Sequence, residues 1–224
     1  MRLTPLVIVG LFFCGASLAQ DADDPDVAMA ALRSQGVRPG ALSPEQWQVL
    51  QNINAYFNRI RVMSGSFTQV GADGRRTEGK FYISKPGKLR FQYTPPTPIE
   101  LIADGQTVAV RDRKLNTQDI YSLSQTPLRF LLASQIDLSR DSSVIGVYGD
   151  NDNLAVTLEE KSSVGGSARI NLVFSAQNYA LQQWTITDAQ GYDTTVAVYN
   201  LDTTKKLDPG MFKIDYTDYS TGNN

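Results

Sequence analysis

The sequence contains no histidine, and its single cysteine, Cys14, lies close to the N-terminus. The first absence excludes Ser-His-Asp and Cys-His catalysis and every zinc or copper site that depends on imidazole. We expect Cys14 to be removed with a signal peptide, so the mature chain would have no disulfide and would need a large core to fold. An enzyme built on this chain is restricted to carboxylate, lysine, tyrosine or serine chemistry.

No apolar run approaches the roughly 20 residues that a membrane-spanning helix needs. The apolar stretch from Leu6 to Phe13 follows one positive charge, Arg2, and precedes the small residues at positions 17 and 19. This order is typical of a secretory signal peptide (residues 1–19), cleaved after Ala19. A lipoprotein signal ending at Cys14 is the alternative, but Phe13 stands where a small residue is expected. We therefore expect a soluble periplasmic protein.

Strong charge of either sign is also missing. The 21 basic and 23 acidic residues become 20 and 23 when Arg2 is removed with the signal, a net charge of −3. This balance gives no reason to expect nucleic acid or a strongly anionic membrane as a partner. Residues 20–42 are rich in Asp, Ala, Pro and Gly and are expected to form a flexible lead. Residues 43–224 are long enough for one domain, which we expect to be monomeric.

A helix is predicted directly after this lead. Ser43 is the expected N-cap, Pro44 the first helical residue, and Gln46 completes a capping box. Bulky apolar residues then recur at spacings of three or four, which places one apolar stripe on a helix of about five turns that Gly65 is expected to end. The stripe consists of Trp47, Leu50, Ile53, Phe57 and Ile60.

Beyond Ser66 the apolar period changes to two, and turn signals recur about every ten residues. We expect strands at 67–70, 79–83, 89–93, 99–103, 107–111, 119–122, 143–148, 154–159, 168–174, 181–187 and 192–199. A short helix at 126–132, capped by Thr126, interrupts them. The fold class predicted is mainly β with some helix (α+β): an incomplete antiparallel β-barrel of about 10–11 strands with helices plugging the mouth.

Four segments occur in a fixed order along the predicted sheet. They are Gly65-Ser66-Phe67-Thr68-Gln69, the run from Gly79 to Tyr93, Ile102-Ala103-Asp104-Gly105, and Leu207-Asp208-Pro209-Gly210-Met211-Phe212. In order and spacing they resemble the LolA family of periplasmic outer-membrane lipoprotein carriers. That family has a Phe-x-Gln strand, a Gly-x-Phe strand, a basic residue before Pro, and an Asp-Gly hairpin. The resemblance covers roughly residues 43 to 216.

The resemblance implies a lipid carrier that is not an enzyme and binds no cofactor, nucleotide or metal. Its cargo would be acylated lipoproteins, received from an inner-membrane ABC exporter and passed to an outer-membrane receptor or to the outer membrane itself. A carrier of this kind is needed physically, because a sixteen-carbon chain exposed to water costs on the order of 12 kcal/mol at about 0.8 kcal/mol per CH₂. The hypothesis requires an apolar cavity that the protein's own side chains leave free.

The candidate cavity residues come from both helices and two strands, and for each the alternative is plain core packing. They are Trp47, Leu50, Phe57, Ile60, Phe81, Ile83, Leu89, Phe91, Tyr93, Leu128 and Leu131. Lys85 stands where the family has an Arg before Pro, so the resemblance implies a role for Lys85 in holding the lid. Arg90 or Arg111 is an alternative for that role, and an exposed turn lysine is the alternative for Lys85 itself.

Two further functions compete with the carrier hypothesis. A LolA-like fold can serve as a periplasmic sensor or bind another lipid. A hydrolase limited to carboxylates is the other candidate, with Glu159 and Glu160 as the only obvious pair. Neighbouring residues on a strand point to opposite faces, so these two carboxylates are badly placed to share a substrate.

Overall fold

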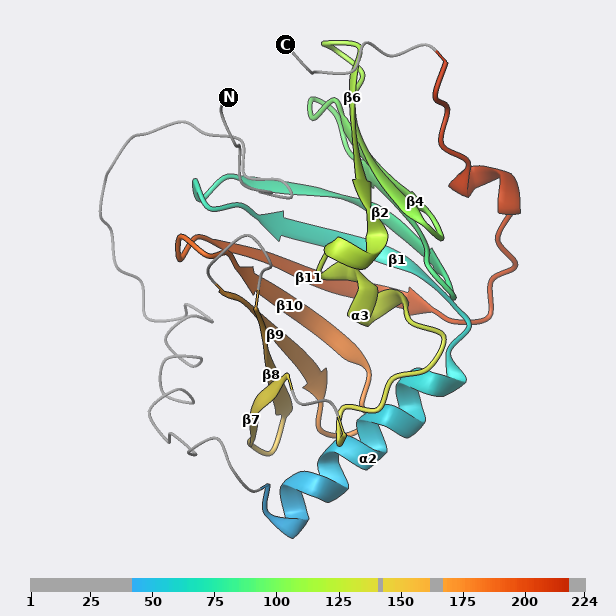
Figure 1. Ribbon diagram of the computed structural model, residues 1–224. Helices are drawn as coiled ribbons and strands as arrows, with labels where there is room; N and C mark the ends of the chain where they lie inside the picture. Colours follow the sequence, from blue (N-terminus) through green and yellow to red (C-terminus); the bar gives the residue numbers. More distant parts are fainter. Residues whose placement is uncertain (1–41, 141–142, 162–166, 218–224) are drawn as a thin grey trace. The chain divides into compact units, whose positions relative to one another are not determined.

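The protein is described by a computed structural model that covers residues 42–140, 143–161 and 167–217 (Figure 1). The predicted signal peptide and nearly all of the predicted lead, residues 20–42, lie outside this range. Within it, no helix has the length and apolar character needed to cross a membrane. The helical elements are α2 (Pro44–Arg59), α3 (Leu128–Leu132) and two short 3₁₀ turns, η1 (Leu123–Gln125) and η2 (Pro209–Phe212).

Eleven strands make up the rest of the regular structure. They are β1 (Val62–Val70), β2 (Arg76–Ser84), β3 (Lys88–Tyr93), β4 (Ile99–Asp104), β5 (Thr107–Asp112), β6 (Thr117–Ser122), β7 (Val144–Gly149), β8 (Asn153–Lys161), β9 (Ser167–Ser175), β10 (Leu181–Thr187) and β11 (Asp193–Asp202). Their hydrogen-bonded order is β6-β5-β4-β3-β2-β1-β11-β10-β9-β8-β7. The order does not return to its start, which confirms the prediction of a mainly β fold with an open, unclosed antiparallel sheet.

The described chain divides into two compact units. Unit 1 contains the first part of α2, the β1–β2 turn and the strands β7 to β10. Unit 2 contains the end of α2, most of β1, the strands β2 to β6, α3, most of β11 and the C-terminal segment.

In unit 1, the register aligns apolar side chains across four antiparallel strands. Leu172 on β9 lies opposite Val156 on β8 and Trp184 on β10, and all three are buried. Both faces of β9 are covered in part, because Val173 and Ser175, on the face opposite Leu172, are also buried.

In unit 2, one face of β2 and β3 carries a cluster of aromatic rings. Phe81 lies opposite Phe91 in the register, and their rings stack with centroids 5.8 Å apart. The Phe67 ring from β1 meets the Phe91 ring at 4.5 Å and the edge of Tyr93 at 5.0 Å. Such ring pairs add to the stability that burial alone provides, so this cluster is the centre of the core of unit 2.

The start of α2 matches its prediction. Ser43 Oγ accepts a hydrogen bond from Gln46 N at 3.2 Å, and Ser43 N donates to Gln46 Oε1 at 2.8 Å, which is a complete capping box. The predicted end is wrong, since the helix stops at Arg59 and Gly65 lies inside β1. A side chain at Gly65 would meet Tyr199 O at 2.8 Å and the Phe81 ring at 2.9 Å, so this glycine serves close packing of strands.

The second helix also differs from its prediction at the N-terminus. The hydroxyl of the expected cap, Thr126, donates to Leu123 O at 2.9 Å at the end of η1, and its backbone carbonyl accepts from Arg129 N of the helix at 3.2 Å. Pro127 occupies the N-cap position of α3 instead. Leu128, Leu131 and Leu132 are buried, while Phe130 is half-buried.

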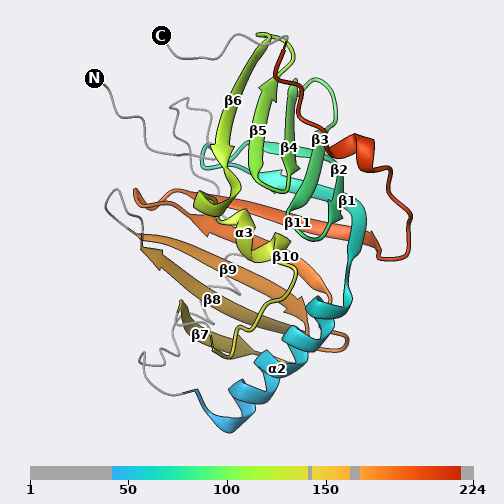
Figure 2. The same ribbon diagram turned by 45° about the vertical axis from the view of Figure 1, so that its right-hand side comes forward.

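The C-terminal segment after β11 is tied to the outer face of β3 to β6, the face opposite the aromatic cluster (Figure 2). Arg90 Nη1 donates to Met211 O at 2.9 Å, and Gln118 Nε2 donates to Asp215 O at 2.8 Å. Tyr216 Oη reaches Thr107 Oγ1 at 3.4 Å. The segment thus lies over Ile102 and Ala109, which its contacts help to bury.

Gly79 offers a direct test of this packing. An added Cβ would overlap the carbonyl oxygen of Gln92 and would lie 2.9 Å from the Phe67 ring. We predict that Gly79→Ala lowers the free energy of unfolding by about 3 kcal/mol or more, because neither neighbour can move without shifting a strand. Urea unfolding followed by Trp fluorescence measures the change.

Gly74→Ala is the matched control, since Gly74 has φ +73° in a turn and open space around its Cα. Its cost should be limited to about 1 kcal/mol from the left-handed backbone. Equal losses in the two variants would contradict the steric explanation.

Candidate functional site

The candidate wall on β2 and β3 forms one continuous apolar surface. Residues Ile83 and Leu89 are paired in the register, two positions along from the Phe81 and Phe91 pair. Because side chains two apart on a strand share a face, these four and Tyr93 point the same way. The structure therefore brings together all five strand residues predicted for the wall.

Tyr93 adds one polar atom to this surface. Its hydroxyl donates to Gln69 Oε1 at 2.6 Å, and both side chains are buried. Burial raises the pKa of Tyr93 well above its usual range. The hydroxyl remains neutral and paired, so it adds no charge to the wall.

The remaining candidates lie on helices. Phe57 and Ile60, at and just after the end of α2, belong to unit 2 and are buried, as are Leu128 and Leu131 of α3. Figure 2 and Figure 1 both show α3 lying against one face of the strands of unit 2. Trp47 and Leu50 belong to unit 1; Leu50 is fully buried, whereas Trp47 is 41 % exposed.

Ten of the eleven candidate residues are thus buried, none of them more than 8 % exposed. They are covered by other side chains in this structure, so the free apolar cavity that the sequence-based hypothesis requires is not found along these ten residues. Any ligand that lies along them must first displace the covering side chains. The contacts that hold this cover in place therefore decide whether the wall is accessible.

Lys85 makes one of these contacts. It follows β2 directly and is only 9 % exposed. Its Nζ donates to Phe57 O in the last turn of α2 at 3.0 Å and lies 4.1 Å from the centroid of the Phe57 ring. Its backbone N–H donates to Arg61 O at 2.8 Å. We call the two contacts between Lys85 and Phe57 the latch, because they tie the end of α2 to the β2–β3 turn.

The latch combines favourable and unfavourable electrostatics. The last carbonyl groups of a helix have no partner within the helix and carry partial negative charge, so an ammonium group is a good donor to them. Burial and, to a smaller extent, the positive charge of Arg61 nevertheless lower the pKa of Lys85 to about 8. Lys85 is therefore held in place as a cation that is only weakly favoured over the neutral amine.

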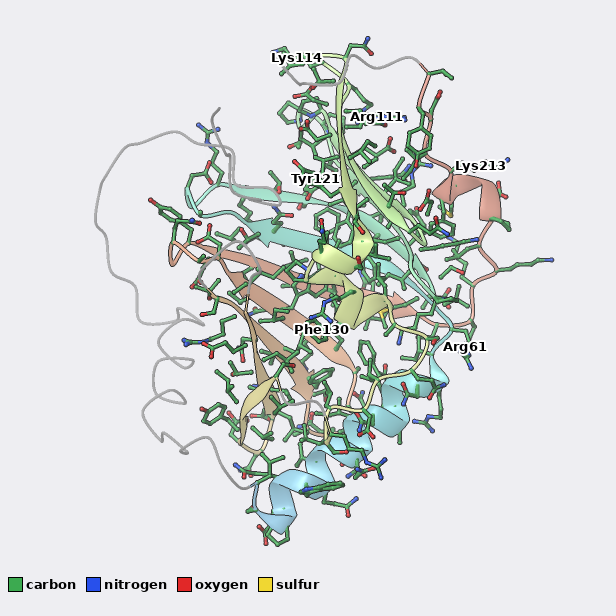
Figure 3. The ribbon with its side chains drawn as sticks, in the orientation of Figure 1. Arg61, Arg111, Lys114, Tyr121, Phe130 and Lys213 are labelled. Carbon is green, nitrogen blue, oxygen red and sulfur yellow. The ribbon has the colours of Figure 1, made fainter. Side chains whose placement is uncertain are left out.

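Arg90 and Arg111 lie elsewhere. Both point to the outer face, the face opposite Leu89 and Phe91, where Glu100 accepts from Arg90 and lies 3.8 Å from Arg111 Nη1. Figure 3 shows Arg111 on the side of the C-terminal segment that carries Lys213. Arg90 was predicted as part of the latch beside Lys85; its contacts in the structure are with Glu100 and Met211 O.

Two asparagines that the sequence analysis did not select also fasten the end of α2. Asn58 Nδ2 donates to Ile136 O at 2.9 Å and its Oδ1 accepts from Ile136 N at 2.8 Å. Asn54 Nδ2 donates to Asp137 Oδ1 at 3.2 Å. The signal in the sequence was their spacing of four, which places both amides on one side of the helix.

Comparison with known proteins identifies the family. The family model described as "Outer membrane lipoprotein carrier protein LolA" matches residues 58–215. The chain belongs to the LolA family. All four segments that carried the resemblance in the sequence lie within the matched range, which confirms that prediction.

Relatives within the LolA family match most of the chain. An outer-membrane lipoprotein carrier protein of Chromobacterium violaceum is 25% identical over 189 residues, which are 81% of this chain and 90% of the relative. One of Neisseria meningitidis serogroup C is 30% identical over 164 residues, 67% of this chain and 75% of the relative. A solved LolA superfamily structure from Nitrosomonas europaea covers 75% of this chain and 98% of its own at 12% identity and TM-score 0.40.

The low pKa of Lys85 in this LolA-family chain yields a prediction. The unfolded chain keeps its lysine proton up to about pH 10.5, whereas the folded chain releases it near pH 8. The unfolded state binds more protons between these values, so the free energy of unfolding should rise with pH there, by about 2 kcal/mol from Lys85.

Comparison of the wild type with Lys85→Met isolates this contribution, because Tyr93 and the other titrating groups are common to both. Urea unfolding at intervals from pH 7 to 10 should show the wild type gaining stability relative to the variant as pH rises. A difference that stays constant over this range would show that the amine is not desolvated.

Proposed function

We propose that this chain is a periplasmic carrier that binds the acyl chains of lipoproteins on the apolar surface of unit 2 and moves them from the inner to the outer membrane. The observation that carries the proposal is the latch. In a chain of the LolA family, a buried lysine ties the end of one helix to the turn beside a continuous apolar wall.

The physical requirements of a carrier support this assignment. The surface that receives acyl chains must be shielded from water when it is unloaded, since an exposed apolar wall of this size would aggregate. The ten buried candidates meet that requirement. The cover must also open at small cost, and a single charged hydrogen bond with a ring contact contributes only a few kcal/mol.

The mechanism that follows has two steps. Release of Lys85 from Phe57 O separates the end of α2 from the β2–β3 turn, while Asn54 and Asn58 keep that end joined to Asp137 and Ile136. The side chains that cover the wall are then replaced by acyl chains. Burial of each CH₂ of the cargo contributes about 0.8 kcal/mol, which compensates for the broken latch and for the lost contacts of the cover. When the cargo leaves, the latch forms again and shields the wall.

The partners proposed are those of a carrier between two membranes. They are acylated lipoproteins, an inner-membrane ABC exporter that loads them, and a receptor at the outer membrane or that membrane itself. The names of the Chromobacterium and Neisseria relatives support the cargo class. No nucleotide or metal is required by this mechanism, and no catalytic step is part of it.

Lys85 variants test the latch. Mature protein is added to spheroplasts that export a lipoprotein, and the lipoprotein released into the medium is measured. We predict that wild type and Lys85→Arg release it, because arginine keeps a cationic donor for Phe57 O. Lys85→Met should increase release by up to about tenfold when the carrier is limiting, because loading no longer has to break one charged hydrogen bond. Equal release by the methionine variant would show that Lys85 is only structural.

A pair of leucines tests the wall. Leu131 is 5 % exposed and Leu115, in the β5–β6 turn, is 68 % exposed. We predict that Leu131→Asn weakens binding of a fluorescent acyl probe by tenfold or more, whereas the same change at Leu115 has no effect.

Because a buried amide costs about 2 to 4 kcal/mol of stability, binding is evaluated for the folded fraction determined by near-ultraviolet circular dichroism. The volume-conserving Leu131→Met should fold and bind normally. Unchanged affinity in folded Leu131→Asn would assign Leu131 to the core alone.

A further inference from the structure

A groove of about 430 Å³ lies in unit 2 at the turn end of the apolar wall. Its sides are the β2–β3 turn at Pro86 and Gly87, the β4–β5 turn at Gly105 and Gln106, and the chain from Ser122 through α3. The two turns approach closely, since a Cβ added to Gly87 would lie 2.7 Å from Gly105 Cα. Gly87 N donates to Leu132 O at 2.8 Å, which fixes α3 beside the first turn.

Among the described residues that line the groove, the polar side chains are donors and none is a carboxylate. They are Gln106, Ser122, Ser124 and Arg129. The two serine hydroxyls lie 2.9 Å apart, and the guanidinium group of Arg129 lies 4.1 Å from the centroid of the Phe130 ring. Amide, hydroxyl and guanidinium groups together are suited to ester and amide carbonyl oxygens, which accept hydrogen bonds and carry partial negative charge.

The same groove borders the apolar wall. The register pairs Ile83 with Leu89, Leu89 with Ala103 and Ala103 with Val108, and these rows end at the two turns that form the groove. Leu132 contributes to the groove and is 1 % exposed, so it connects the polar rim with the apolar interior. A polar site that continues into an apolar wall is the arrangement an amphiphile requires.

The groove is large enough for the head group of an acylated cargo but not for its acyl tails as well. Small-molecule pockets have volumes of about 300 to 1,000 Å³. A groove near the lower limit takes one polar group of the size of a substituted glycerol, and the several acyl chains of a lipoprotein need additional room. The tails would therefore lie along the wall and only the head in the groove.

We propose that this groove binds the ester- and amide-bearing head group of the acylated N-terminus of the cargo, while the acyl chains occupy the wall. The inference rests on the carrier function proposed above and adds a polar site to it. Arg129 and Gln106 are its specificity residues, because both line the groove, one from α3 and one from the β4–β5 turn, and both carry donors for the ester carbonyl groups. The latch lies at the same turn, since Lys85 immediately precedes Pro86.

The test uses the mature full-length protein and two probes. The first is a synthetic peptide with an N-terminal dipalmitoyl-S-glyceryl cysteine, and the second is diphenylhexatriene, an apolar dye without hydrogen-bonding groups. The variants are Gln106→Leu and Arg129→Leu. Gln92→Leu and Arg113→Leu make the same exchanges at exposed positions outside the groove.

We expect Gln106→Leu and Arg129→Leu each to weaken lipopeptide binding by about five- to tenfold, the effect of one lost hydrogen bond, and to leave dye binding unchanged. Both control variants should bind both probes like the wild type. Gln106 is exposed, so its variant is expected to fold even if Arg129→Leu does not.

The possible contrary results have different meanings. If the wild type binds both probes and the groove variants bind the lipopeptide normally, the head-group site is wrong and the carrier function stands. If a groove variant loses both probes equally, the loss is general and the head-group site is also wrong. If the wild type binds neither probe, the carrier function itself fails.

Discussion

The alternation of side chains along β2 to β5 is the constraint on which the site depends. Because successive residues of a strand point to opposite faces, the register that pairs Phe81 with Phe91 places the aromatic cluster on one face and sends Arg90 to the other. A shift of one residue would exchange the apolar wall for the Arg90–Glu100–Arg111 group. The antiparallel register therefore separates the surface proposed for lipid from the surface that binds the C-terminal segment.

The latch is the exception to this separation of polar and apolar groups. Its ammonium group lies among apolar neighbours and depends on one backbone carbonyl and one aromatic ring for compensation. Buried charges with so few partners are rare, because desolvation normally outweighs the interactions gained. A contact that is only marginally favourable suits a structure that must open, and this is why Lys85 carries more of the functional argument than the better-paired arginines.

Sequence reasoning succeeded where one local pattern determines structure. The capping box at Ser43 and Gln46 and the period-two strands were predictable, because each depends on residues a few positions apart. It failed where a distant residue decides the outcome. Gly65 was interpreted as a helix stop, but its lack of a side chain leaves room for the Phe81 ring and the carbonyl of Tyr199. Thr126 was interpreted as a helix cap, but its hydroxyl donates to Leu123 O.

The candidate site followed the same rule. The five residues on β2 and β3 were predictable as one surface because strand periodicity fixes their common face. Their burial was not predictable, since the covering side chains come from elements distant in sequence. The position of Arg90 was open to deduction, because it alternates with Leu89 and Phe91, whereas the carbonyl of Phe57 beside Lys85 is known only from the fold.

The hydrogen bonds of the C-terminal segment determine the order in which unit 2 is completed. Arg90 and Gln118 precede β7, yet the carbonyl oxygens that they bind belong to Met211 and Asp215, which lie 121 and 97 residues further along the chain. Until the segment that follows β11 is in place, the outer face of β3 to β6 holds guanidinium and amide donors without these acceptors, above Ile102 and Ala109. Unit 2 therefore reaches its final structure only after that segment has docked on its outer face.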